Sequence, residues 1–379
     1  MKRPEIAPSR STAAIPLTRI LLVRLRLIGD VVLTTPVIRA VRRALPDAHL
    51  AYLVEPRAAG VVLGHPLLDD VIVAPALRGW ARWRADAALA RRLRRDRYDA
   101  VLDFHGGPRS AFLTRASGAP RRIGYDVPGR RWMYTERIPR PPGRPRHSVE
   151  NQWDLLEALL PGIGRPTRAH DPAEMPDDTD ARGRLSERLA ALGVAADSPL
   201  LVVHVGAGNE FRTWPEESFA AVVASLHAHD PERRIVLTTG AEQEATAVRI
   251  SRLARAAGVP EEAAPVLCDL DLAEVRALVA RARVFVGGDS GPAHIAATTG
   301  VPIVGIFGPT TPAVWGPWRD PASVTELVEI EGLGCRPCDQ RHCEPGDFRC
   351  LRAIPPGQVV SAVERALERE AARPDASRP

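Results

Sequence analysis

The sequence has no apolar run that approaches the roughly 20 residues needed to cross a bilayer. Its opening stretch, MKRPEIAPSRSTAAIPLTR, also lacks the continuous apolar core of a secretory signal. The composition is 45% hydrophobic and 26% charged, which is typical of a soluble globular protein and unlike a disordered chain. Together these absences predict a cytoplasmic protein.

Cysteine is scarce and unevenly placed, with five residues in a chain of 379. Four of them follow the spacing C-x2-C-x4-C-x6-C, at Cys335, Cys338, Cys343 and Cys350. This crowding is unlike the spread framework of a secreted disulfide protein. The first pair has the spacing of zinc ligands, whereas the later spacings are short for a zinc ribbon. A structural zinc, reduced thiols and a redox-labile bridge all stay open, and nothing connects the segment with catalysis.

Lysine is nearly absent, because Lys2 is the only lysine among 51 lysine and arginine residues. A GC-rich genome would produce this preference. Arginine also suits phosphate and carboxylate ligands, because its planar guanidinium group binds them in a bidentate manner. No base-reading motif accompanies these arginines, so nucleic acid is not an expected partner despite the formal charge of +5.

The length predicts two domains, and the first half has the pattern of an α/β domain. Apolar runs at 19–25, 49–55, 71–74 and 98–106 predict strands, and amphipathic patterns at 31–45 and 80–96 predict helices between them. Strands that alternate with helices form a parallel sheet covered by helices. We therefore expect a Rossmann-like lobe over residues 19–165, preceded by a disordered extension at 1–18.

The second half repeats this pattern after a linker, which is predicted at 166–184 from its Pro, Gly, Asp and Arg content. It contains an apolar run from 200 into a glycine loop, a strand–loop–helix pattern at 234–254, and a helix with a capping box of Asp271 and Glu274. We expect a second Rossmann-like lobe at 185–362 and a polar tail at 363–379. Two such lobes bind ligands in a central cleft between the carboxyl ends of their sheets.

Residues 284–300 read VFVGGDSGPAHIAATTG, a strand followed by small polar residues and a short helical pattern. Asp289 and Ser290 occupy helix-capping positions, and Gly291 allows a close backbone approach. Free N–H groups at a helix start favour anions, and a diphosphate is the anion expected in a two-lobe fold. In the alternative, structural interpretation, Ser290 only caps the helix and His294 packs beneath it.

Four further polar residues follow predicted strands, and each has a functional and a structural interpretation. Arg212 is a cation near the same phosphates or a surface charge. Glu244, or alternatively Glu242, accepts from ribose hydroxyls or complements a helix dipole. Asp30, in RLIGD, is a helix cap or a general base, a role worth about 10²–10⁴ in rate. His105, in DFHGG, contacts an acceptor substrate or is structural.

Five motifs in order resemble the ADP-heptose:lipopolysaccharide heptosyltransferases of glycosyltransferase family 9. They are GD at 29–30, a basic residue before TWPEESF, GAEQE, GDSGPAHIAA and FGPTTP, and the resemblance runs from about 19 to 360. It implies the two-lobe GT-B fold, with the nucleotide sugar on the second lobe and the acceptor on the first. It also implies transfer of a heptose from ADP-heptose to a lipopolysaccharide-core acceptor of the lipid A/Kdo type, with inversion and without a metal.

The resemblance assigns roles to individual positions as well. Asp30 matches the proposed catalytic base, Glu244 matches an acid that contacts ribose, and Arg212 falls where relatives have a lysine. The donor-binding loop of the family corresponds to Asp289, Ser290, Gly291 and His294. Two departures are arginine for lysine at 212, which keeps the charge but not the geometry, and Ser290 where some relatives have threonine.

Trp80, Trp83 and many arginines at 80–97 predict either a solvated face or a surface for anionic glycolipid head groups and inner-leaflet phosphates. The second interpretation predicts peripheral contact with the inner face of the inner membrane. Other functions also stay open: a family 9 transferase with another donor or acceptor, a nucleotide-sugar epimerase, and a non-catalytic nucleotide-binding module. A dehydrogenase is disfavoured, because RLIGD is not G-x-G-x-x-G.

Overall fold

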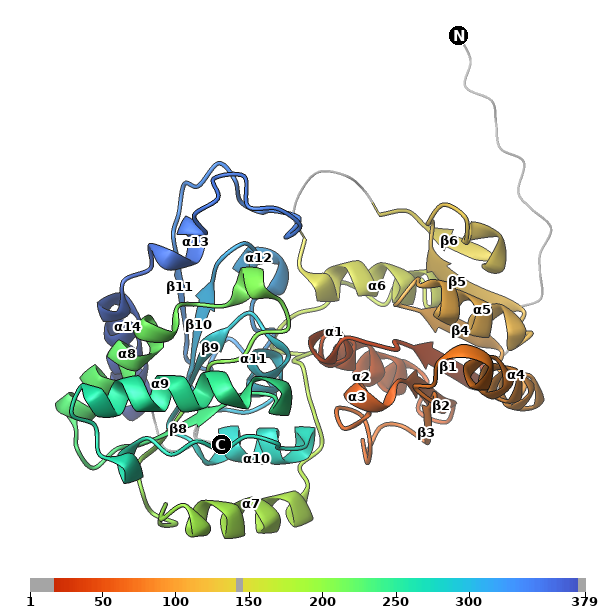
Figure 1. Cartoon of the computed structure of the whole chain (residues 1–379). Coiled ribbons are helices and arrows are strands. Elements are labelled where there is room, and N and C mark those ends of the chain that lie inside the picture. Colours follow the sequence, from red (N-terminus) through yellow and green to blue (C-terminus); the bar gives the residue numbers. More distant parts are fainter. Residues whose placement is uncertain (1–16, 141–145, 374–379) are drawn as a thin grey trace.

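The computed structural model describes residues 17–140 and 146–373, which form two α/β lobes side by side (Figure 1). Each lobe is built on one parallel sheet, as the sequence predicts. Residues 1–16 of the expected N-terminal extension lie outside the described residues, whereas Thr18 is fixed by a 2.8 Å hydrogen bond from its N–H to Asp99. Within the described part of the chain, no helix is long and apolar enough to span a membrane.

The first lobe has a six-stranded sheet in the order β3-β2-β1-β4-β5-β6. Its elements are β1 (Arg19–Val23), α1 (Ile28–Val32), α2 (Thr35–Ala44), β2 (His49–Val54), α3 (Pro56–Ala59), β3 (Asp70–Val73), α4 (Gly79–Arg95), β4 (Ala100–Asp103), α5 (Pro108–Ala116), β5 (Arg121–Tyr125), η1 (Arg131–Met133), β6 (Glu136–Ile138) and α6 (Ser148–Leu159). In the central strand, Leu21 lies opposite Ala51 and Val101, and all three are fully buried. Helices on both faces explain why these strands are continuously apolar.

The single helix predicted at 31–45 is wrong, because the chain forms two helices there, α1 and α2. Pro36 lies in the first turn of α2, where its missing N–H costs no hydrogen bond. The Thr34 hydroxyl donates to the Val31 carbonyl at 2.7 Å and also lies 2.7 Å from the Tyr52 hydroxyl. This break leaves α1 as a separate short helix directly after β1.

The second lobe has a five-stranded sheet in the order β11-β10-β9-β7-β8. Its elements are α7 (Thr179–Ala191), β7 (Leu200–His204), η2 (Glu210–Arg212), α8 (Glu216–His229), β8 (Arg234–Thr238), η3 (Ala241–Gln243), α9 (Glu244–Ala256), η4 (Glu261–Ala263), α10 (Leu272–Arg281), β9 (Val284–Gly288), α11 (Gly291–Ala296), β10 (Ile303–Phe307), α12 (Pro312–Trp315), β11 (Thr325–Glu329), α13 (Arg349–Arg352) and α14 (Pro356–Ala371). Its core consists mainly of valine, leucine, isoleucine and alanine from both faces of the sheet.

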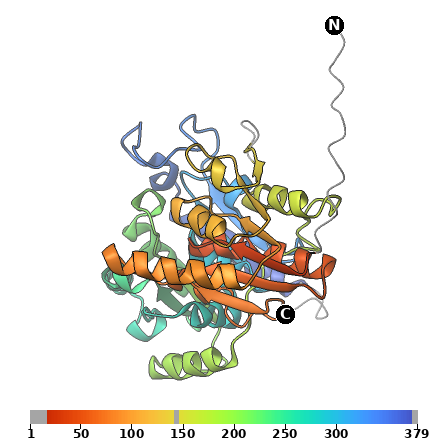
Figure 2. The ribbon, with the colours of Figure 1, turned by 90° about the vertical axis from the view of Figure 1, so that its right-hand side faces the viewer.

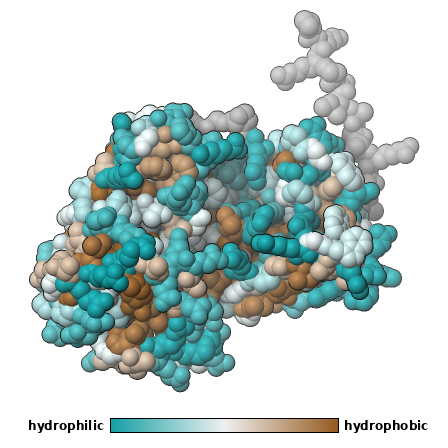
Figure 3. Space-filling model, viewed as in Figure 1, coloured by the Kyte–Doolittle hydropathy of each residue, from teal (hydrophilic) through white to brown (hydrophobic). Residues whose placement is uncertain are grey.

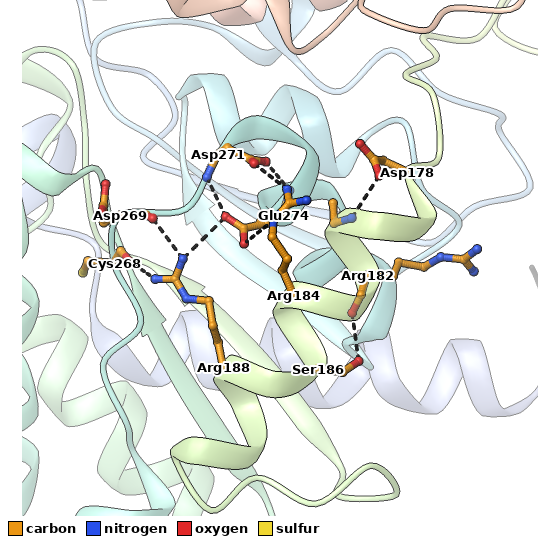
Figure 4. Close-up of polar contacts among 10 residues, drawn as sticks. Asp178, Arg182, Arg184, Ser186, Arg188, Cys268, Asp269, Asp271 and Glu274 are labelled. Atoms are coloured by element: carbon orange, nitrogen blue, oxygen red, sulfur yellow. Dashed lines mark hydrogen bonds and ion pairs between the residues drawn. The ribbon is translucent and has the colours of Figure 1, made fainter.

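The linker predicted at 166–184 contains the start of α7, which packs on α10. Arg184 lies 2.7 Å from the Asp271 carboxylate, and both Arg184 and Arg188 lie within 3.5 Å of Glu274 (Figure 4). The predicted capping box of α10 is confirmed, because Asp271 and Glu274 each accept the other's backbone N–H. Residues from 179 onward therefore belong to the second lobe.

The polar tail predicted at 363–379 includes the end of α14, which continues to residue 371. Val363 and Ala366 are fully buried, and Glu364 pairs with Arg233 at 2.6 Å. The charged outer face of α14 makes the stretch polar on average although one side of the helix is apolar. Residues 374–379 lie outside the described residues.

The chain between the lobes is held by contacts with the loop after α12. The Ala173 N–H donates to the Trp318 carbonyl at 3.0 Å, and the Trp318 indole donates to the Asp171 carbonyl at 2.7 Å. Near the start of α6, His147 Nε2 donates to the Gly316 carbonyl at 3.0 Å. These bonds fix the first lobe against the second on the side of the linker.

Candidate active site

The short helices α1 and α11, one from each lobe, touch each other where the two sheets end. A Cβ atom on Gly29 would lie 2.4 Å from Cδ2 of His294, and one on Gly291 would lie 3.0 Å from Cβ of Ile28. Both glycines are therefore needed for the close approach of the helices. The surface is hollowed between the two lobes in the space-filling view (Figure 3). The sequence-predicted residues Asp30 and His294 thus come from opposite lobes and lie at one junction.

Asp30 lies in the first turn of α1 and is largely buried, with 14% of its side chain exposed. Its carboxylate forms an ion pair with Arg24 and accepts the Leu27 N–H at 3.3 Å. Arg24 also donates to the Phe104 carbonyl at 2.5 Å, so its guanidinium group joins β1, α1 and the loop after β4. Asp30 thus lies at the third position of α1 and reaches back to the N–H of Leu27, which is the N-cap residue, and its expected role as a general base stays a prediction.

His105 lies on the first-lobe side of this junction, in the loop after β4. Its Nδ1 donates to the Arg26 carbonyl at 3.1 Å, and the Asp103 carboxylate accepts its backbone N–H at 2.9 Å. Burial lowers the pKa of His105, and the charge of Arg24 lowers it further. The ring therefore stays neutral at physiological pH, and its expected contact with an acceptor stays a prediction.

Asp289 is the central carboxylate on the second-lobe side, with 4% of the residue exposed. Its Oδ2 accepts from the Thr310 hydroxyl at 2.7 Å and lies 3.1 Å from Arg212 Nη1, while its Oδ1 lies 3.7 Å from His294 Nε2. Burial alone would raise the pKa of Asp289, but His294, Arg212 and Thr310 together hold it below its usual value. The carboxylate is therefore charged and links Arg212, Thr310 and His294.

Ser290 and His294 carry polar atoms that are buried without a partner. Ser290 is the N-cap residue of α11, but its side chain makes no capping hydrogen bond, so the simple cap interpretation is wrong. Ser290 Oγ and His294 Nδ1 have no hydrogen-bond partner in the described structure. Leaving a buried polar atom unpaired costs about 1–3 kcal/mol. Such a cost at two nearby atoms is typical of a site whose ligand supplies the missing bonds.

Arg212 and Glu244 lie in two other loops of the second lobe. Arg212 ends η2, with 30% of its side chain exposed, and its Nε donates to Gln340 Oε1 at 2.7 Å. Gln340 belongs to the Cys-rich segment and was not predicted, because no local pattern marks a partner 128 residues away. Glu244 begins α9 and is exposed, which agrees with the helix-dipole interpretation and leaves the ribose contact a prediction.

The four crowded cysteines are free thiols in the loop after β11 and in α13. Among the residues that the structure describes, no group of three or more His, Cys, Asp or Glu is arranged to hold a metal ion. The structural zinc expected at Cys335, Cys338, Cys343 and Cys350 is therefore not supported. An open groove of about 950 Å³ lies between α7 and α10, and none of the predicted site residues lines it.

Comparisons with known proteins agree with this arrangement. A family model described as glycosyltransferase family 9 (heptosyltransferase) matches residues 87–346. The chain is 26% identical to lipopolysaccharide heptosyltransferase 3 of Escherichia coli, over 90% of this chain and 97% of that protein. It is 29% identical to lipopolysaccharide heptosyltransferase 1 of Pseudomonas aeruginosa, over 86% of this chain and 87% of that protein.

A solved structure gives the same result for the fold. The structure of E. coli ADP-heptose lipopolysaccharide heptosyltransferase II matches with a TM-score of 0.76 at 19% identity, over 93% of this chain and 100% of that chain. At this identity the match concerns the fold alone. The expected two-lobe GT-B architecture is confirmed.

Proposed function

This chain belongs to glycosyltransferase family 9 (heptosyltransferase), and from that premise we propose that it transfers a heptose from ADP-heptose to a sugar hydroxyl of the lipopolysaccharide core. As a glycosyltransferase it is neither an epimerase nor a non-catalytic nucleotide-binding module. The resemblance of its motifs to the ADP-heptose:lipopolysaccharide heptosyltransferases supports the choice of donor. The relatives named lipopolysaccharide heptosyltransferases support a lipopolysaccharide acceptor.

The observation that carries the proposal is the asymmetry of the junction between α1 and α11. On the second-lobe side, Ser290 Oγ and His294 Nδ1 are buried without partners. Arg212 is held close to them by its ion pair with Asp289. On the other side Asp30 is held in place. Hydroxyl, imidazole and guanidinium groups are suitable partners for a diphosphate, and a fixed carboxylate is suitable for accepting a proton.

The proposed reaction is a single displacement. Asp30 takes the proton of the acceptor hydroxyl, whose oxygen forms a bond to the anomeric carbon of the heptose. The bond from that carbon to the diphosphate oxygen breaks, and its electron pair leaves with ADP, so the configuration is inverted. Arg212 and Ser290 stabilise the charge that develops on the diphosphate. In this scheme the arginine supplies the positive charge, and no metal takes part.

The test of this scheme is the variant Asp30→Asn, which keeps the size of the side chain and removes the base. We expect turnover of ADP-heptose with a core acceptor to fall about 10²–10⁴-fold, as is typical for loss of a general base. Binding of ADP, measured by calorimetry, should stay within about twofold of wild type, because the diphosphate contacts lie on the second lobe.

The matched control is Asp126→Asn, which changes a half-exposed first-lobe carboxylate that pairs with Arg131. It should leave both turnover and ADP binding unchanged. Loss of ADP binding together with turnover in Asp30→Asn would show that Asp30 is only structural. The assays contain a chelator, and failure of the wild type under that condition would contradict the metal-free scheme.

For the acceptor side, we propose that α4 and η1 contact the anionic membrane surface. Trp80, Trp83 and Trp132 expose 80%, 65% and 62% of their surface, and α4 lies on the outside of the first lobe (Figure 2). Arg84 and Arg95 of α4 make no ion pair with any described residue. Exposed tryptophans favour the membrane interface, and each nearby arginine adds about 1 kcal/mol with anionic lipids.

The test is co-sedimentation of the protein with two kinds of vesicle, one that contains up to about 30% anionic lipid and one that contains only neutral lipid. Wild type should bind anionic but not neutral vesicles, and Trp80→Ser together with Trp83→Ser should lower the bound fraction several-fold. Turnover with a short soluble acceptor should not change. Equal binding of the double variant would contradict the proposed surface.

A further inference from the structure

The Cys-rich segment 335–350 packs directly on two loops of the second lobe that contain Arg212 and Thr310, the partners of Asp289. The Cys338 N–H donates to the Pro309 carbonyl at 3.2 Å, and Arg336 donates to the Thr310 carbonyl at 2.6 Å. At the other end of the segment, the rings of Phe348 and Phe211 lie 5.4 Å apart. The segment therefore connects loop 308–311, after β10, with loop 209–212, after β7.

Gln340 is the residue of this segment that reaches a predicted donor-binding side chain. Its Oε1 accepts from Arg212 Nε at 2.7 Å and from Asn209 Nδ2 at 3.2 Å. Its backbone has φ +58°, in the left-handed region that favours glycine. Such a conformation is strained for a residue with a side chain and persists where surrounding contacts impose it, most often at functional sites. We propose that Gln340 is a positioning residue, which holds Arg212 ready for the diphosphate of the donor.

The geometry of the guanidinium group supports this role, which rests on the proposed function. The Nε–H of Arg212 donates to Gln340, and the Asp289 carboxylate lies 3.1 Å from Nη1 of the same arginine. Nη2 makes no hydrogen bond with the residues that the structure describes. The arginine is thus held at two nitrogens and presents the third.

Without Gln340, the neighbouring carboxylate would compete for the arginine. Charged hydrogen bonds between a carboxylate and arginine are among the strong ones. Without the bond from Nε to Gln340, Asp289 alone holds the guanidinium group, which then turns towards that carboxylate and presents less of its charge to the diphosphate. Gln340 therefore acts through Arg212 and has no contact with the sugar in this scheme.

The test uses Gln340→Leu, which keeps much of the side-chain volume and removes the acceptor oxygen. We expect ADP to bind about fivefold to tenfold more weakly by calorimetry, the equivalent of losing one hydrogen bond of ordinary strength. The KM for the sugar donor should rise by a similar factor, and kcat should fall as well, because Arg212 also stabilises the charge that develops on the diphosphate. The control is Arg341→Gln, a change of the next side chain, which is 86% exposed and should leave ADP affinity unchanged.

A double-variant cycle separates positioning from a structural effect. Arg212→Gln should weaken ADP binding, and Gln340→Leu added to it should change the affinity by less than about twofold, because its partner is gone. Full additivity, or unchanged ADP affinity in Gln340→Leu alone, would overturn the proposal. If Gln340→Leu lowers the Tm, Gln340→Met is measured in the same cycle with the same criteria. Absence of ADP binding in the wild type would contradict the proposed function instead.

Discussion

The two sides of the junction differ in how far their polar groups are satisfied within the protein. In the first lobe, the Asp30 carboxylate has Arg24 and the Leu27 N–H as partners. In the second lobe, Ser290 Oγ and His294 Nδ1 are buried with none. A satisfied carboxylate is positioned before any substrate arrives, whereas unpaired buried atoms gain their bonds only when a ligand supplies them. On this comparison the Asp30 carboxylate is held in place before substrate binds, whereas the proposed ligand would supply the missing bonds of Ser290 and His294.

A large effect is expected from changing the contact that joins the two sides, with Gly29→Ala. The added Cβ would lie 2.4 Å from the His294 ring, where carbon atoms normally stay about 3.5–4.0 Å apart. The helices must separate by about 1 Å, and a displacement of that size typically costs about 10²-fold in rate. We expect steady-state turnover to fall by that factor and ADP binding to weaken.

Alanine variants of two other glycines serve as comparisons for the loss of turnover in Gly29→Ala. Gly291→Ala would place its Cβ 3.0 Å from Ile28, a smaller overlap, so its loss of turnover should be smaller. Gly183→Ala, in α7, meets no atom within 4 Å and should leave turnover unchanged while raising the Tm slightly. Wild-type turnover in Gly29→Ala would show that the junction tolerates separation, and the comparison of the two sides would then have no functional meaning.

Much of this site was predictable from the sequence because its loops follow apolar strands. The glycine, aspartate and serine after β9 and the aspartate after β1 lie at the ends of parallel strands, and such ends meet at one edge of a sheet. The capping box of α10 was predictable for the same kind of reason, since its two residues are three positions apart.

The partners of these residues were not predictable, because they are distant in sequence or act through packing. Gln340 lies 128 residues from Arg212 and in a segment whose cysteines draw attention to metal binding instead. The capping pattern at Ser290 was misleading, since a sequence cannot show that a suitable side chain leaves its hydroxyl unpaired. α14 was missed because burial of one helix face depends on the strands and helices that cover it.

A matched pair of variants tests the comparison of the two sides without any turnover assay. Ser290→Ala removes an unpaired buried hydroxyl, so the free energy of unfolding without ligand should stay constant or rise by up to about 1 kcal/mol. Arg24→Met removes the partner of a largely buried carboxylate, and the free energy of unfolding should fall by about 1–3 kcal/mol.

The rise in Tm that ADP produces should rank the two variants in the opposite order. A ligand that binds only the folded state stabilises a protein more as the ratio of free ligand concentration to Kd rises. At one ADP concentration, a weaker site therefore gives a smaller rise in Tm. Ser290→Ala should therefore gain less from saturating ADP than wild type, because a bond to the diphosphate is lost. Arg24→Met should gain as much as wild type, since its change lies on the first lobe. Thermal melts with and without ADP measure both quantities, and a destabilised Ser290→Ala without ligand would mean that its hydroxyl already has a partner in the free protein.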